Sequence, residues 1–309
     1  MPPTSVSLPR NHLTGESRTG ELCTIIGRAL PADGIRQVTP NLEFFRLSMP
    51  LGPLHGVAKP SFCVIAQGAK VVLLGNAAYR YDSEHYLLAS LELPVIGEIV
   101  DASSAMPYLA LRVVLEPITI AEVMLDAGIH RDSGSATPLC GMDVCRLDSR
   151  LLDVTVRLAR LADASAAEIK VLSPLLMREL IFVLLMGEQG ERLRQIGVHG
   201  GVTARIADAV SMLHHRFAEP LPIPELARAA GMSASGFYSH FKAVTGFSPL
   251  QFQKHVRLQE ARRLLHGSDI DIAGAGYKVG YEDASQFSRE YKRMFGATPS
   301  RDVEARRAV

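Results

Sequence analysis

The sequence predicts an α+β protein in which an N-terminal β-sandwich or β-barrel is followed by connecting helices and a C-terminal all-α domain. Three observations predict this fold class. Glycine and proline recur about every 8 to 12 residues between residues 42 and 125 and separate short apolar runs, which is typical of an all-β unit. From residue 148 onward, apolar residues recur at spacings of three and four, as in amphipathic helices. The length of 309 residues suffices for two domains of roughly 150 residues each.

The N-terminal part of the chain is expected to be a tail followed by the β-domain. Residues 1–20 are polar and lack the apolar centre of a secretory signal, so we expect a disordered tail. Residues 21–137 are expected to form the β-domain, with SFCVIAQ, KVVLLG and YLALRVVLE among its strands. Glycines on both sides of KVVLLG predict hairpin turns, which favours a sandwich or barrel over a parallel sheet. The chain contains neither GxGxxG nor GxxxxGKS/T, the motifs of nucleotide-binding folds.

Residues 138–202 are predicted to form connecting helices. A leucine-rich stripe at helical spacing runs through residues 151–161, and SPLLMRELIFVLLM predicts a second helix that ends near Gly187 and Gly190. Two interpretations remain open for these helices. They either pack between domains or pair across the two-fold axis of a dimer, or they close the core of the first domain.

Charge is divided unevenly along the chain. The whole chain has a net charge of +1, whereas residues 203–309 contain 15 Lys and Arg against 11 Asp and Glu, a balance of +4. This C-terminal third is therefore the expected place for a nucleic acid. Four cysteines without a CxxC motif fit a reduced cytoplasm. No uncharged apolar run approaches the roughly 18 residues that span a bilayer, so we expect a cytoplasmic protein with no membrane partner.

The C-terminal domain contains two segments of the same design, at about 224–245 and 272–296. Each has a short Ala-containing helix, a glycine, an N-cap residue and a second helix with two aromatic residues four positions apart. The glycines and N-cap residues are Gly231 with Ser233 and Gly280 with Asp283. These features predict two helix-turn-helix units, each of which offers its second helix to the major groove of DNA. The same shape also occurs in packing modules, but two copies in one domain favour DNA binding.

Helical spacing indicates which side chains point away from the buried aromatic stripe of each second helix. They are Ser235, Tyr238, Ser239 and Lys242 in the first unit and Ser285, Ser288, Arg289 and Lys292 in the second. Arg289 is the expected base contact, because a guanidinium can donate two hydrogen bonds to guanine. Lys242, Lys292 and Arg293 are expected to contact phosphates.

A long amphipathic stretch, LQFQKHVRLQEARRLLHG, joins the two units. It must be a rigid helix if the units are to bind adjacent major-groove segments about one turn of DNA, roughly 34 Å, apart. Arg257 and Arg262 lie on the flanks of this helix. They are expected either to contact phosphates or to form local ion pairs, for instance with Glu260.

The C-terminal third resembles the AraC family of bacterial transcription regulators. The residues that carry the resemblance are LARAAGMSASGFYSHFKAVTGFSPLQF, RLQEARRLL and VGYEDASQFSREYKRMFGATPSR, in this order. The N-terminal part is similar to the N-terminal domain of such regulators through KPSFCVIAQGAK, YRYDSEHYLLASLELPV and MPYLALRVVLEP. The resemblance implies a DNA-binding domain with two helix-turn-helix units and a cupin-like β-fold that serves effector sensing or dimerisation.

The resemblance also implies contacts and partners. Family DNA contacts, carried over by position, fall on Ser235, Tyr238, Ser239, Ser285 and Arg289, in agreement with the helical spacing. Many members have Arg or Gln where this chain has Ser239, so its first helix is expected to have weaker direct base recognition. The implied partners are a double-stranded DNA operator, an unidentified small-molecule effector, a second copy in a homodimer and, for an activator, RNA polymerase.

An effector site is expected in the β-domain, without metal or cofactor. By analogy with the family, Gln67, Tyr79, Tyr81 and Tyr108 are polar groups on apolar strands that converge inside a barrel or else lie exposed on strand faces. The histidines are scattered and no HxH motif occurs, so we expect no metal, no cofactor and no enzymatic activity.

Three alternatives remain open. The chain could be a cupin-like metal-binding enzyme or module with a degenerate helical tail. It could also be a constitutive DNA binder whose N-terminal domain senses nothing. Independently of these, a redox-sensing thiol at Cys63, or at Cys140 with Cys145, stays possible where a cation lowers the thiol pKa.

Overall fold

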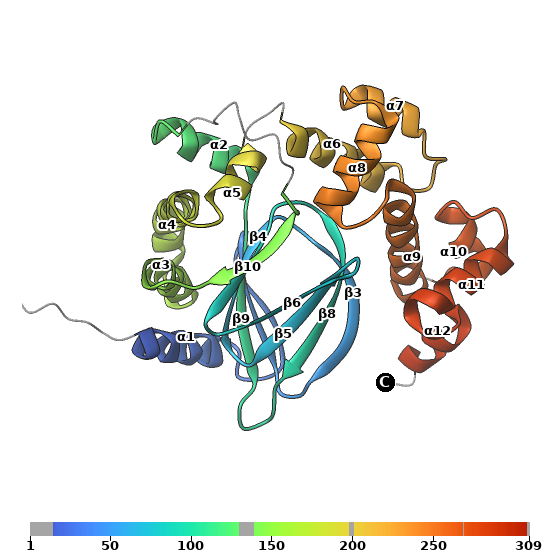
Figure 1. The fold of residues 1–309 in the computed structure, drawn as a ribbon. Coiled ribbons are helices and arrows are strands. Elements are labelled where there is room, and N and C mark those ends of the chain that lie inside the picture. Colours follow the sequence, from blue (N-terminus) through green and yellow to red (C-terminus); the bar gives the residue numbers. More distant parts are fainter. Residues whose placement is uncertain (1–14, 130–138, 198–200, 268, 308–309) are drawn as a thin grey trace, which may run out of the picture.

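The computed structural model describes residues 15–129, 139–197, 201–267 and 269–307. A β-domain occupies the centre, helices α1 to α5 lie on one side of it, and helices α6 to α12 lie on the other (Figure 1). The strands are β1 (Gly34–Thr39), β2 (Leu42–Leu47), β3 (Leu51–Ala58), β4 (Ser61–Gln67), β5 (Ala69–Leu74), β6 (Ala77–Asp82), β7 (His85–Ala89), β8 (Leu93–Asp101), β9 (Tyr108–Val114) and β10 (Met142–Arg146). The helices are α1 (Gly15–Ala29), α2 (Pro117–Asp126), α3 (Ser149–Ala159), η1 (Arg160–Asp163), α4 (Ala166–Met186), α5 (Gly190–Gly197), α6 (Val202–His215), α7 (Ile223–Ala229), α8 (Ala234–Thr245), α9 (Pro249–Gly267), α10 (Ile272–Lys278), α11 (Ala284–Phe295) and α12 (Pro299–Arg307).

The β-domain consists of two antiparallel sheets, as the sequence predicts. One has the order β1-β2-β9-β4-β7-β10 and the other the order β3-β8-β5-β6. Strand β6 contacts β4, β7 and β10 of the opposite sheet, so the sheets meet along this edge. Strands β5 and β6 form the hairpin expected after KVVLLG, where Gly75 has a φ of +58°. Strand β10 pairs with β7, so the β-domain continues past the boundary expected at residue 137.

Helix α1 is an element that the sequence analysis did not predict. It begins at Gly15 and therefore contains the last residues of the segment expected to be a disordered tail. Leu22, Ile25 and Ile26 are buried in the core that this helix shares with the larger sheet. The apolar residues of α1 hold the start of the described chain against the β-domain. Residues 1–14 lie outside the described residues.

The leucine stripe of α3 closes the core of the first domain. Leu151, Leu152, Val154 and Leu158 are all buried, and α3 contacts α1 and α4. The structure thereby decides between the two interpretations of residues 151–161. Since these leucines are already covered within the chain, they do not supply the dimer surface that the stripe had suggested.

The first helix-turn-helix unit shares a hydrophobic core with the β-domain. Phe237 and Phe241 belong to the same buried cluster as Ile65 and Leu74. The backbone also joins the two parts, because Gly141 N donates a hydrogen bond of 2.7 Å to Val244 O at the end of α8. The DNA-binding domain is therefore docked on the β-domain.

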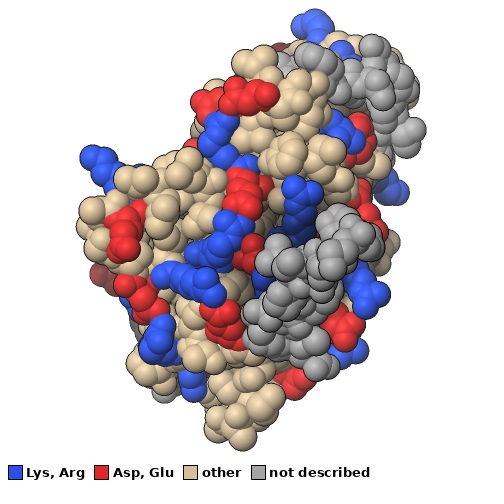
Figure 2. All heavy atoms as spheres, turned by 90° about the vertical axis from the view of Figure 1, so that its left-hand side faces the viewer, with Lys and Arg blue, Asp and Glu red and all other residues tan. Residues whose placement is uncertain are grey.

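Acidic and basic side chains alternate over the face formed by α1, α3 and α4 (Figure 2). Many of them are paired across helices, as Arg18 is with Asp153 and Arg157 with Glu179. The described residues of this face form no patch of a single sign, in contrast to the surface expected of a nucleic-acid interface. In the described part of the chain, no helix is both long and apolar enough to cross a membrane.

Candidate nucleic-acid interface

The first helix-turn-helix unit consists of α7 and α8. Gly231 between them has a φ of +62°, a conformation that favours glycine. The Ser233 side chain caps α8 by accepting a hydrogen bond of 3.2 Å from Gly236 N. Phe237 and Phe241 are fully buried, with ring centroids 5.5 Å apart, so they fix which face of α8 points outward.

The second unit, α10 and α11, repeats this design. Gly280 has a φ of +89°, and a Cβ on it would lie 2.1 Å from Ala218 O, so glycine is needed both for conformation and for space. Asp283 caps α11 by accepting a hydrogen bond of 2.7 Å from Ser285 N. Phe287 and Tyr291 are fully buried and pack 5.6 Å apart. Both units therefore present a capped helix whose outer face is fixed by an aromatic pair.

Helix α9 braces the two units against each other. The Arg257 guanidinium donates hydrogen bonds to four main-chain carbonyls, which are those of Phe217, Ala218, Glu219 and Gly280. Among the described residues Arg257 thus bonds to main-chain carbonyls and forms no ion pair with an acid, so the expected local ion pair is wrong for this arginine. Its phosphate contact stays a prediction. The sequence could not indicate these acceptors, because main-chain carbonyls leave no signal in it.

Arg262, the second flanking arginine of α9, forms an ion pair. Its Nε and Nη2 donate to the carboxylate of Asp302 in α12, each at 2.8 Å. Tyr291 of α11 donates to the same carboxylate at 2.6 Å. Arg262 thus ties α9 to α11 and α12, which makes the second unit a single packed body.

Most of the predicted DNA contacts are exposed on the outer faces of α8 and α11. The exposed ones are Ser235, Ser239, Lys242, Ser285, Arg289, Lys292 and Arg293. Tyr238 and Ser288 are half-buried. The Arg289 side chain is 70% exposed, and its guanidinium lies a long 3.9 Å from the carboxylate of Asp283. A DNA base can therefore replace that partner at little cost.

Lys242 differs from the other predicted contacts because it lies beside the β-domain. Together with Gly246 it lines a cavity of about 280 Å³ whose opposite side is formed by the β5–β6 turn at Gly75 and Asn76. A Cβ on Gly75 would lie 2.6 Å from Gly246 O, so this turn packs tightly on the end of α8. The C-terminal end of the first candidate recognition helix is thus in contact with the β-domain.

A cavity of about 590 Å³ lies between the two sheets of the β-domain. Of the four predicted effector residues, Tyr81 and Tyr108 line it. The other two do not line it. Gln67 donates a hydrogen bond of 2.7 Å to Pro107 O, and the Tyr79 hydroxyl lies 3.4 Å from Cys140 Sγ. Lys70 and His55 also line the cavity, and the sequence analysis missed both.

Strand β3 connects this cavity with the DNA-binding domain. His55 lines the cavity and packs its ring on Phe295 of α11, with centroids 4.7 Å apart. At the next residue, Gly56 O accepts a hydrogen bond of 3.0 Å from Gln259 of α9. Figure 1 shows β3 on the side of the β-domain that faces α9. Burial lowers the pKa of His55 to about 4, and the positive charges of Arg262 and His255 act in the same direction.

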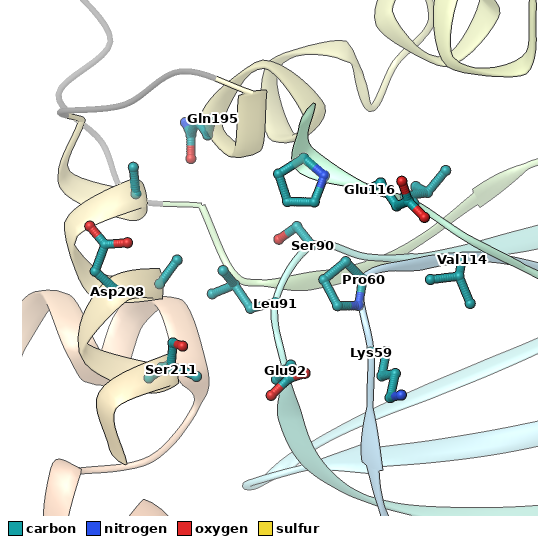
Figure 3. Close-up of a pocket in the computed structure, with 15 residues that line it drawn as sticks. Lys59, Pro60, Ser90, Leu91, Glu92, Val114, Glu116, Gln195, Asp208 and Ser211 are labelled. Carbon is teal, nitrogen blue, oxygen red and sulfur yellow. The ribbon is translucent and has the colours of Figure 1, made fainter. Parts of the chain in front are cut away.

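A second cavity, of about 450 Å³, lies where α6 meets the β-domain (Figure 3). Asp208 and Ser211 reach it from α6, and Glu92 and Lys59 from the opposite side. Glu116 also lines it, so carboxylates outnumber the single lysine. The lining of this cavity is mainly acidic, whereas cations outnumber acids in the lining of the cavity between the sheets.

The other candidate groups in the sequence were metal ligands and reactive thiols. No group of three His, Cys, Asp or Glu side chains among the described residues could hold a metal ion. Burial raises the pKa of the thiols of Cys63 and Cys145. These shifts oppose the thiolate that redox sensing needs. Cys140 contacts the Tyr79 hydroxyl.

Comparison with known proteins gives two family matches. Residues 38–192, half of the chain, match the model of the AraC-type transcriptional regulator N-terminus. Residues 226–305 match the model of a helix-turn-helix domain. The two matches cover the β-domain with its connecting helices and both candidate DNA-binding units.

Individual relatives match over shorter stretches. The chain is 38% identical over 80 residues to the MmsAB operon regulatory protein of Pseudomonas aeruginosa, covering 26% of each chain. It is 28% identical over 158 residues to the transcriptional activator RhaS of Escherichia fergusonii, covering 50% of this chain and 55% of RhaS. The chain thus spans about half or less of these relatives. Among solved structures, ToxT from Vibrio cholerae superposes with a TM-score of 0.54 at 8% identity, over 88% of this chain and 98% of ToxT, which shows a shared fold.

Proposed function

This chain belongs to the AraC-type transcriptional regulators, and from that premise we propose that it binds a double-stranded DNA operator through α8 and α11. Each helix enters the major groove with its exposed face, and α9 holds the two helices for adjacent groove segments. Arg289 donates to guanine, while Lys242, Lys292 and Arg293 contact phosphates. Binding to operator DNA in the cell requires a cytoplasmic protein, and RNA polymerase is the further partner when binding activates transcription.

The observation that carries this proposal is the duplication of the capped helix. Gly231 and Gly280 have the same positive φ range, Ser233 and Asp283 cap the helices, and both helices end at a left-handed glycine. A packing module needs neither two such units nor a row of exposed polar side chains on each. The four Lys and Arg side chains proposed to contact DNA are all exposed.

Hydroxyl-radical footprinting of the full chain on the DNA upstream of its own gene tests this proposal. Two protected segments about one helical turn apart are expected, since each unit covers one major-groove segment. A single short footprint would show that only one unit binds. Uniform weak protection would show that the chain lacks a specific operator.

We also propose that the cavity between the sheets is the effector site and that β3 transmits its occupancy. Strand β3 lines the cavity at His55 and holds α9 and α11 through Gly56 and His55. A ligand that shifts β3 changes both contacts, and it therefore changes how the second unit is held. The effect is a shift between docked and released populations of the DNA-binding domain.

A homodimer through α2 and α4 completes the proposal. Val171, Leu172 and Leu175 lie on one face of α4 and are exposed, Val171 by 61% and Leu175 by 59%. Ile118 and Leu125 of α2, which contacts α4, are exposed as well. Five exposed large apolar side chains on two adjacent helices are typical of a protein interface. The same patch on a second copy gives a two-fold dimer.

A further inference from the structure

Lys70 of β5 places a cationic group inside the cavity between the sheets. The side chain is enclosed by protein but keeps an intermediate exposed fraction, as expected of a residue that lines a cavity. Space for it exists because Gly97 on the neighbouring strand β8 has no side chain. A Cβ there would lie 3.1 Å from Lys70 Cε and 3.5 Å from Nζ. Burial lowers the pKa of Lys70, and the positive charge of Arg112 lowers it further.

Within the described residues, no hydrogen bond or ion pair is found for Lys70, and no carboxylate influences it. The other two cations that line the cavity are better compensated. Arg112 pairs with Glu43, and Arg46 lies 3.8 Å from Asp33. A buried ammonium without a partner is costly, so such a group is retained where a ligand supplies the missing negative charge.

The surroundings of Lys70 indicate what kind of anion fits. The Tyr81 and Tyr108 hydroxyls face each other in the same cavity, and burial raises the pKa of both, so both stay protonated. Since Tyr81 donates its proton to the Tyr108 oxygen, the Tyr108 proton is the one left for a ligand. Most of the remaining lining is apolar and includes Leu47, Val72 and Ile99. About 590 Å³ is the size of a site for one small molecule.

We propose that the cavity between the sheets binds a small organic carboxylate, whose charged group pairs with Lys70 and whose apolar body fills the space between the sheets. Tyr108, whose oxygen accepts a hydrogen bond from Tyr81, donates its own proton to an oxygen atom of the carboxylate. This inference rests on the proposed function, since it names the chemical class of the effector. Arg46, whose buried Nε has no hydrogen-bond partner in the part of the chain that the structure describes, offers a second donor nearer β1.

The test compares acids with uncharged molecules of the same shape. Benzoate, 4-phenylbutanoate and naphthalene-2-carboxylate, each with its primary amide, are titrated into the full chain by calorimetry. At least one acid is expected to bind, and its amide to bind at least about tenfold more weakly, because a hydrogen-bonded ion pair contributes that much. Lys70→Met is expected to weaken acid binding by about ten- to a hundredfold, whereas Lys70→Arg retains it.

Lys59→Met is the matched control, because Lys59 is the single lysine of the second cavity. Three results would each overturn the proposal. They are acid binding that depends on Lys59 but not on Lys70, equal binding of acid and amide, and no binding of any acid. If Lys70→Met does not fold, two other variants test the same point. Lys70→Arg is expected to retain acid binding, and Gly97→Val, which fills the space beside the ammonium, is expected to weaken it.

The affinity of the full chain for DNA, measured with and without the acid, separates this inference from the proposed function. Lys70-dependent acid binding that leaves DNA affinity unchanged would establish the ligand site and remove its role as an effector site. Specific DNA binding without any acid binding would leave the regulator in place and refute the carboxylate. The carboxylate site and the DNA-binding function can therefore be refuted separately.

Discussion

Arg289 is the residue whose replacement separates base recognition from general attraction to DNA. Its side chain is 70% exposed, and its ion pair with Asp283 is long at 3.9 Å. Arg289→Ala is expected to cost about 1 to 3 kcal/mol of binding free energy on the operator and to relax specificity at one base pair. The measurement is the affinity for the operator and for single-base-pair variants of it.

Lys292→Ala is the matched control for Arg289→Ala on the same helix. Lys292 is exposed near the end of α11, where a phosphate contact is expected, so its loss should weaken binding to all sequences alike. Equal losses on matched and mismatched operators for Arg289→Ala would show that Arg289 contacts only the backbone.

Gly280, between α10 and α11, is the position at which the packing of the second helix-turn-helix unit can be tested. Gly280→Ala forces a positive φ on alanine and places a Cβ 2.1 Å from Ala218 O. Gly296→Ala is the matched control, since Gly296 has a φ of +79° but open space around it. The control is expected to cost about 1 to 2 kcal/mol of unfolding free energy, and Gly280→Ala distinctly more. Equal losses in chemical denaturation would contradict the close packing at Gly280.

We expect strand β3 to make the docking of the DNA-binding domain sensitive to pH. The pKa of His55 is lowered to about 4 when docked, against about 6.5 when free, so release favours proton uptake between these values. The contribution of His55 to docking is fully present above pH 6.5 and declines as the pH falls toward 4. Burial also lowers the pKa of His255 and His214, so these two histidines change the pH dependence of docking in the same direction as His55.

Hydrogen exchange of α9 and α11 measures this release. Exchange is expected to rise between pH 7 and pH 5, after correction for intrinsic rates, and His55→Gln is expected to reduce the rise. His215→Gln, at the exposed end of α6, is the control. An identical rise in the wild type and in His55→Gln would exclude β3 as the pH-sensitive contact.

The elements differ in how much of them the sequence could predict. Helices α8 and α11 follow from local signals, because caps, turn glycines and aromatic spacing lie within one short segment. Helix α1 was missed because its apolar residues are few and its start is polar. Strand β10 was missed because it pairs with β7, which lies more than fifty positions earlier in the chain. Long-range pairing leaves no local pattern.

The same distinction applies to the candidate sites. The exposed face of a capped helix is set by helical geometry, so its side chains can be predicted one by one. A cavity is set by how two sheets pack, and no spacing in the sequence indicates that Lys70 meets Gly97 of β8 and Tyr108 of β9 there. For this reason the family analogy included two tyrosines that line the cavity together with two residues that lie elsewhere.

At the scale of the whole molecule, the exposed apolar residues of α4 predict a dimer that a single charge disrupts. Leu175→Glu is expected to shift the chain from dimer to monomer, because it places a charge at the centre of a two-fold interface. Sedimentation velocity measures the change. Leu250→Glu, on an exposed leucine of α9, is the control. A wild-type chain that is monomeric at all concentrations would contradict this interface.

The central claim is that the whole chain recognises a specific DNA sequence. The most direct measurement is the affinity of the full chain for the DNA upstream of its own gene and for a scrambled sequence, over a series of salt concentrations, repeated with Arg289→Ala. A preference of about a thousandfold or more, which persists as salt weakens both complexes and falls in the variant, is the predicted result. Equal binding to both DNAs at every salt concentration would contradict it.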